Sequence, residues 1–114
     1  MKILALDQAT QKTGWSISVD GKLNKYGTIK SSKKNIVDRM QYMYETIGSL
    51  IDSERPDHIV IEQVQNQNNN KVYSQLSQLQ GVLFALFFAR NIPFDVVLAS
   101  DWKPVFGVFC SLVN

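Results

Sequence analysis

The chain has 114 residues, of which 45% are hydrophobic and 19% are charged, and its net charge is +2. This length and composition are those of one soluble globular domain, and so small a charge neither requires nor excludes a nucleic-acid partner. The longest apolar stretch, Val82 to Ala89, falls short of the roughly 20 residues that span a bilayer, and the single cysteine, Cys110, excludes an internal disulfide. Because Met1 leads directly into a predicted strand and not into a signal peptide, we expect a cytoplasmic protein without a membrane partner.

Three short strands are predicted near the N-terminus. Residues 2–7 form an aliphatic run that ends in Asp7, and residues 15–19 and 23–29 have the composition of two further strands. Asp20-Gly21 between them is typical of a two-residue hairpin turn. We therefore expect an antiparallel meander of three strands.

A helical crossover follows the meander. Apolar residues recur at helical spacing over residues 35–53, namely Ile36, Met40, Met43, Ile47, Leu50 and Ile51. We expect Ser31 or Ser32 to cap this helix and Pro56 to end it. The next strand, residues 58–62, should be parallel to the first and beside it, because a helix joins the two.

The remaining chain predicts a second helix and a fifth strand. Helical spacing continues over residues 70–90, at Val72, Leu76, Leu79, Leu83 and Leu86. Residues 91–93 end this helix, residues 94–99 form the strand, and Ser100 to Lys103 are typical of the start of another helix. The predicted order is β-β-β-α-β-α-β, which is an α/β domain.

Asp7 and Glu62 each stand at the carboxyl end of a predicted buried strand. Open α/β sheets bind ligands at this edge, and the crossover should bring the two strands together. Two neighbouring carboxylates repel each other unless a cation lies between them, so the pattern predicts a site for Mg²⁺, with Mn²⁺ as a substitute. The alternative is that both are ordinary surface acids.

Two segments carry a resemblance to a known family. Residues 3–15 are similar to an opening strand, an acid and a Thr-Gly-aromatic turn, and residues 56–64 are similar to a second acidic strand in which Glu-Gln follows a Pro-Asp entry. The spacing from Glu62 to Asn69, Leu76, Gln78 and Gly81 also fits, as does the step from Pro93 to Lys103. Over residues 2 to about 108 the chain resembles the RuvC family of bacterial Holliday junction resolvases and their phage relatives.

The resemblance implies one ribonuclease H-like domain over residues 1–114, with three antiparallel and two parallel strands flanked by helices. It implies a homodimeric, structure-selective endonuclease that resolves four-way DNA junctions by metal-dependent phosphodiester hydrolysis, in a bacterial cell or a phage-infected host. Asp7 would bridge two metal ions, and Glu62 would hold one of them.

Six residues are candidates for DNA contact. Lys12 and Thr13 lie in the turn beside Asp7, although a solvated turn is the alternative, and Lys103 matches a family position at the DNA backbone. Asn69 fits the family spacing, and Gln65 stands where the family has a base-stacking aromatic residue. Tyr73 is the candidate that could supply a ring in its place, although an ordinary tyrosine is the alternative.

Other polar residues have simpler interpretations. We interpret the basic cluster of Lys30, Lys33 and Lys34 as a solvated face, and His58 as a structural residue. Asp20 and Asp101 are interpreted as turn and cap residues.

The chain departs from the family pattern at Ala9, where the family has glycine, and at its C-terminal end. Family members continue through a basic segment to a helix with further metal-binding acids or a histidine, whereas no acid follows Asp101 here. We therefore expect a form that is truncated relative to an active enzyme and that binds branched DNA more readily than it cleaves it.

A homodimer interface is expected on the second helix, because Leu83, Phe84, Phe87 and Phe88 make it apolar on more than one face.

The sequence leaves two other functions open. One is a non-catalytic module that binds branched DNA. The other is an ATP-binding domain of the actin and sugar-kinase type, which would need a second phosphate hairpin that 114 residues do not provide.

Overall fold

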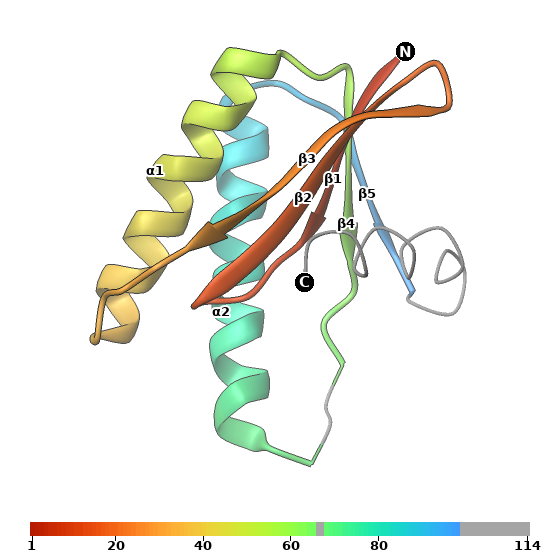
Figure 1. Cartoon of the computed structure of the whole chain (residues 1–114). Coiled ribbons are helices and arrows are strands. Elements are labelled where there is room, and N and C mark those ends of the chain that lie inside the picture. The colour runs from red at the N-terminus through yellow and green to blue at the C-terminus, as the bar shows by residue number, and fades with distance from the viewer. Residues whose placement is uncertain (66–67, 99–114) are drawn as a thin grey trace.

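The computed structural model describes residues 1–65 and 68–98, and this part of the chain forms the predicted elements in the predicted order (Figure 1). They are β1 (Lys2–Asp7), β2 (Lys12–Val19), β3 (Lys22–Lys30), α1 (Ile36–Glu54), β4 (His58–Glu62), α2 (Asn70–Ala89) and β5 (Phe94–Val97). The end of the predicted fifth strand at Ala99 and the predicted helix start at residues 100–103 lie outside the described residues.

The strands form one mixed sheet in the order β3-β2-β1-β4-β5. β3, β2 and β1 are antiparallel neighbours, whereas β4 is parallel to β1 and β5 is parallel to β4. The prediction that the helical crossover places β4 beside β1 is therefore confirmed.

Both helices cover the same face of this sheet (Figure 1). Alternate strand residues point to this face and are buried beneath the helices. Among the described residues, the large apolar side chains that are fully buried are Leu4, Leu6, Ile17, Ile59 and Ile61 from the sheet, Met43, Ile47 and Ile51 from α1, and Leu79, Leu83, Leu86 and Phe87 from α2. By length and composition alone α2 is apolar enough to cross a membrane, and four of its side chains belong to the core.

The helix ends differ in detail from the sequence prediction. Asn35 caps α1 through its side-chain oxygen, which accepts from the backbone N–H of Val37 at 2.8 Å, so the prediction of Ser31 or Ser32 was wrong. The Ser31 hydroxyl instead accepts from the N–H of Lys33 at 3.2 Å. At the other end, Arg55 adopts a left-handed conformation and its N–H closes the last turn on Ile51.

A β-bulge near the hairpin sets the register of β2 against β3. The turn residues Asp20 and Gly21 both have positive φ angles, as a two-residue hairpin turn requires. Ser18 pairs with Leu23 but Ile17 pairs with Lys25, so Asn24 is the additional residue. Beyond the bulge, every β2 residue faces a β3 residue one position further along the chain than a regular hairpin would give.

Glu54, at the end of α1, joins the helix to two strands. Its two carboxylate oxygens lie 3.1 Å from Lys2 Nζ and 3.0 Å from Lys25 Nζ. The hydrogen bond from Lys25, with a second from Lys2, lowers the pKa of this carboxyl below its ordinary value of 4.5.

We expect Glu54→Gln to destabilise the fold at neutral pH but not at low pH. The folded pKa is lower than the unfolded one, so the stabilisation is complete above pH 4.5 and disappears as the pH falls through the folded pKa. The expected loss at pH 7 is about 1 kcal/mol, or about 4 °C in Tm. Thermal unfolding at pH 7 and pH 3 measures this, with the exposed Glu45→Gln as control. A Tm difference that persists unchanged at pH 3 would contradict the assignment.

Candidate functional site: two carboxylates at the ends of β1 and β4

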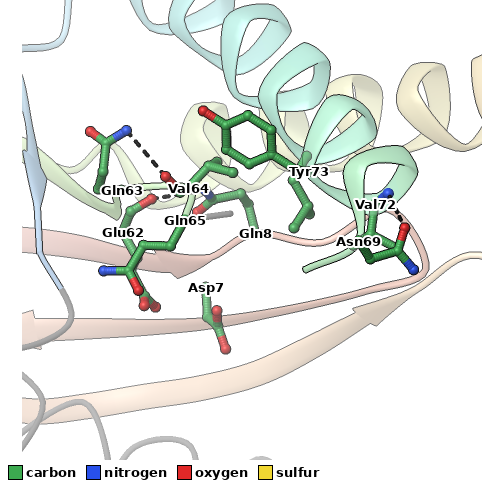
Figure 2. A pocket seen from close by; sticks show the side chains of 10 residues that line it. Asp7, Gln8, Glu62, Gln63, Val64, Gln65, Asn69, Val72 and Tyr73 are labelled. Carbon is green, nitrogen blue, oxygen red and sulfur yellow. Dashed lines mark hydrogen bonds between the residues drawn. The ribbon is translucent and has the colours of Figure 1, made fainter. Parts of the chain in front are cut away.

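Asp7 and Glu62 occupy neighbouring positions on the open face of the sheet. Leu6 pairs with Ile61 in the parallel register, so the next residue on each strand is one of the two acids. Adjacent strands lie about 4.8 Å apart, and both side chains point away from the buried face to which Leu6 and Ile61 belong. Both acids line one pocket of about 360 Å³ at the carboxyl ends of the strands (Figure 2).

Lys12 and Thr13 are the first two residues of β2 and do not lie in the turn beside Asp7, where they were expected, but Thr13 closes that turn. The Thr13 hydroxyl donates to the carbonyl oxygen of Ala9 at 2.8 Å and accepts from the N–H of Ala9 at 3.1 Å, and the side chain is fully buried. A buried hydroxyl that holds the turn in this way does not face a phosphate. Thr13 therefore supports the site structurally, and we do not retain it as a DNA contact.

Two buried glutamines lie beneath Glu62, and the sequence analysis did not single them out. Nε2 of Gln8 and Nε2 of Gln80 each donate to the main-chain oxygen of Glu62, both at 2.9 Å. The two side chains come from the end of β1 and from the middle of α2, and both are more than nine-tenths buried. Gln80 falls at helical spacing with Leu76, Leu83 and Phe87, and this is the signal in the sequence that could have identified it. Gln8, which follows β1, has no comparable signal.

The first turns of α2 form the opposite wall of the pocket. Asn69 caps this helix, since its side-chain oxygen accepts from the N–H of Val72 at 3.1 Å. Tyr73 and Gln65 line the same pocket and are exposed, Gln65 on the side of the acids and Tyr73 on the side of α2 (Figure 2).

Lys12 faces Lys30 across the β2–β3 pair, a juxtaposition that the sequence analysis missed. Both side chains are exposed. They lie on the same face of the sheet as Asp7, because Asp7 pairs with Gly14 and Gly14 lies two residues beyond Lys12. The backbone positions of the two lysines therefore lie about 7 Å along the strands from the row that contains Asp7.

His58 is paired with a carboxylate, and the lysines before α1 are exposed. His58 Nε2 lies 2.7 Å from the Asp95 carboxylate, which supports the interpretation of His58 as structural. Lys33 and Lys34 are exposed before α1, and the Arg39 side chain donates to the carbonyl of Lys33. Lys103 lies outside the described residues.

The donor set at the pocket fits one hard divalent cation. Carboxylate oxygens are preferred ligands of Mg²⁺, which often takes only one or two protein carboxylates and completes its coordination with water. Across residues 1–65 and 68–98, no group of three or more His, Cys, Asp or Glu side chains is placed to hold a metal ion. The described part of the chain therefore supplies two carboxylate ligands, fewer than a two-metal centre requires.

Most of the apolar residues expected at a homodimer interface on α2 are buried or packed within the subunit. Leu83 and Phe87 are fully buried within the subunit, and Phe84 stacks on Phe94 with ring centroids 5.0 Å apart. Phe88 is 66% exposed and is the member of this group that remains available at the surface.

Comparisons with known proteins identify what the chain is similar to. Residues 3–107 match the family model described as crossover junction endodeoxyribonuclease RuvC. The RuvC protein of Borrelia turicatae is 29% identical over 100 residues, which cover 82% of this chain and 62% of that protein. The RuvC protein of Dictyoglomus thermophilum is 32% identical over 88 residues, which cover 73% of this chain and 56% of that protein.

A solved structure, that of T. thermophilus RuvC in complex with Holliday junction substrate, superposes with a TM-score of 0.81 at 14% identity. The match covers 91% of this chain and 68% of that one. At this identity the likeness bears on the fold, and it confirms the predicted ribonuclease H-like architecture. The chain spans about 60% of the length of the curated relatives described above.

Proposed function

Because this chain belongs to the RuvC family of crossover junction endodeoxyribonucleases, we propose that it acts as a nuclease domain on four-way DNA junctions. The observation that carries the proposal is the position of Asp7 and Glu62, side by side at the ends of the parallel strands β1 and β4. This is the edge at which open α/β sheets bind their ligands. We place the protein in the cytoplasm, where junction DNA would be its substrate.

Asp7 and Glu62 would hold Mg²⁺, or Mn²⁺ in its place, at this edge. The chemistry that such a cation would supply, when bound, is Lewis-acid stabilisation of the phosphodiester and a lower pKa of water. The carboxylates also concentrate cations beside a polyanionic substrate. The remaining residues of the site bind and orient the DNA.

Lys12 and Lys30 are suited to the phosphate backbone. Their ammonium groups are exposed on the face that carries the acids, and phosphate contacts of this kind position a duplex without reading its sequence. Tyr73, at the mouth of the pocket, can stack on an unpaired base beside the branch point, which is the role of the family's aromatic residue at the position of Gln65. Lys103 remains a proposed contact on the basis of family resemblance.

A mobility-shift and nicking assay with a four-way junction tests the proposal. We expect the 114-residue chain to retard the junction at lower protein concentration than a linear duplex of equal length. Incision in Mg²⁺ or Mn²⁺ should be weak, because distributed phosphate contacts tolerate an incomplete metal site better than hydrolysis does. Equal affinity for junction and duplex would contradict junction recognition, and efficient paired incision would contradict the ranking of binding above cleavage.

The non-catalytic alternative has one observation in its favour. Two carboxylates are present at the pocket where a two-metal mechanism needs more, within the residues that the structure describes. Junction binding with no incision in either metal would select this alternative.

We also propose that the protein is a homodimer, because symmetric cleavage of a four-way junction needs two active sites related by a two-fold axis. The outer surface of α2 is the proposed interface. Ser77, Gly81, Ala85 and Phe88 are exposed there at helical spacing. Among the described residues, a Cβ added to Gly81 would meet nothing within 4 Å apart from its chain neighbours and the backbone of α2 itself. Small side chains of this kind allow two helices to approach closely.

We expect Gly81→Arg to convert the dimer into a folded monomer. The position is open within the part of the subunit that the structure describes, so the arginine is expected to obstruct an approaching helix. Light scattering at high protein concentration measures the mass. Val37→Arg, at an exposed apolar residue of α1, is the matched control and should remain dimeric. A wild-type chain that is monomeric at high concentration would refute the interface.

A further inference from the structure

The main-chain carbonyl of Glu62 is held by side chains where the strand ladder stops. The β1–β4 register ends at Leu6 opposite Ile61, so Glu62 lies just beyond the last pair. After Glu62 the chain leaves the regular strand, at Gln63 to Gln65. The carboxylate that would bind the cation is thus carried by the last residue of β4, which still pairs with Val97 of β5 but lies just beyond the last pair with β1.

Gln8 and Gln80 supply the hydrogen bonds that the ladder no longer provides. Each donates its amide N–H to the same oxygen at 2.9 Å, one from the end of β1 and the other from α2. In both side chains the amide nitrogen must face the Glu62 carbonyl, because a flipped amide would place its own oxygen against the carbonyl oxygen and the two would repel. The backbone at Glu62 is therefore tied to the two elements that form the walls of the pocket.

The Gln8 side chain lowers the stability of the folded state in a way that its structural role does not explain. Within the described residues its Oε1 atom is buried and has no hydrogen-bond partner. A buried acceptor without a donor destabilises the folded state, and a leucine of similar volume would remove that cost. Departures from optimal stability of this type are expected at functional sites.

We propose that Gln8 and Gln80 are positioning residues that fix the Glu62 carboxylate for cation binding. The inference rests on the proposed function, since it assumes that Asp7 and Glu62 bind a divalent cation. The glutamines touch neither the cation nor the DNA in this scheme. They act on the ligand through its main chain, in the way that residues behind a metal ligand commonly orient it.

The test measures Mn²⁺ binding to the full 114-residue chain by electron paramagnetic resonance, for wild type, Gln8→Leu, Gln80→Leu and the double variant. Gln78→Leu is the matched control, because Gln78 lies on the same helix and is exposed. Each single variant should bind Mn²⁺ about tenfold more weakly. The double variant should lose more Mn²⁺ affinity than the two single losses combined, because each single variant keeps one donor on the shared oxygen.

Two further readouts separate positioning from folding. The ¹³C chemical shift of the Glu62 carbonyl should move in each variant, and the Tm of Gln8→Leu should stay close to that of wild type because an unpaired acceptor is removed together with a donor. A carbonyl shift that moves while Mn²⁺ affinity stays unchanged would overturn the proposal and leave the glutamines with a purely structural role. If wild type itself binds no Mn²⁺, the proposed cation site fails as well, and this is seen before any variant is compared.

Discussion

Asp7→Asn is expected to abolish divalent-cation binding and to reduce any metal-dependent incision by at least about 100-fold. The variant removes one of the two carboxylates at the pocket and leaves the side-chain volume almost unchanged. Binding to a four-way junction without metal should change by no more than about twofold, because phosphate contacts elsewhere supply the affinity. Loss of cation binding with retained DNA binding is the pattern expected of a metal ligand.

Thermal unfolding with and without Mg²⁺ gives an independent measurement of the same variant. A ligand present at ten times its Kd stabilises the folded state by about 1.4 kcal/mol, so Mg²⁺ should raise the Tm of wild type and of the control Glu45→Gln. It should not raise the Tm of Asp7→Asn or Glu62→Gln. An equal Mg²⁺-induced rise in all four proteins would place the cation elsewhere.

Charge reversal at both Lys12 and Lys30 is expected to weaken junction binding by tenfold or more. Each lysine that contacts a phosphate releases about one counterion on binding, so the slope of log K against log salt should fall by about two. The two lysines face each other across β2 and β3, and we expect them to act on one stretch of backbone. Titrations at several salt concentrations provide the slope.

Lys22→Glu is the control for this prediction. Lys22 lies on β3 and is exposed, but it stands at the opposite end of the strand from Lys30. It should change the affinity by a small, nonspecific amount. A similar loss in the control and in the double variant would show that net charge, and not the position of the lysines, governs binding.

The arrangement of the sheet could be predicted because each element carries a clear local pattern. The aliphatic runs at residues 2–7 and 58–62 have the composition of buried strands. A helix of 19 residues lies between them, and strands joined by such a crossover are usually parallel to each other. The two carboxylates follow from the same reasoning, since both end their strands. That the two acids lie next to each other was therefore predictable without any knowledge of the side chains around them.

The juxtaposition of Lys12 and Lys30 could not be predicted because it depends on one bulged residue. A regular hairpin around Asp20-Gly21 would place Lys12 opposite Ile29. The bulge at Asn24 shifts the register by one, and Lys30 becomes the partner. Nothing in the local sequence requires the additional residue to be accommodated at that point.

The roles of several polar side chains depend on three-dimensional neighbours. Thr13 and Asn69 have residue types suited to phosphate contact, but a hydroxyl near a tight turn and an amide before a helix have competing local partners. At Thr13 the local partner prevails, in the closed turn at Ala9, whereas the cap at Val72 uses only the side-chain oxygen of Asn69, and Asn69 stays a proposed DNA contact. Gln8 and Gln80 meet at one carbonyl although 72 positions separate them in the chain, a contact that local patterns do not reveal.

Mn²⁺-induced line broadening in the ¹H–¹⁵N spectrum tests the central claim, that Asp7 and Glu62 together form a divalent-cation site. A paramagnetic ion broadens the signals of nearby amides, so the set of broadened signals locates the ion. We predict selective broadening at residues 7–8 and 62–63 in wild type, and its absence in Asp7→Asn. Broadening centred on another acidic group, such as Asp38 and Glu45 on α1 or Asp95 on β5, with the signals of residues 7 and 62 unaffected, would contradict the account.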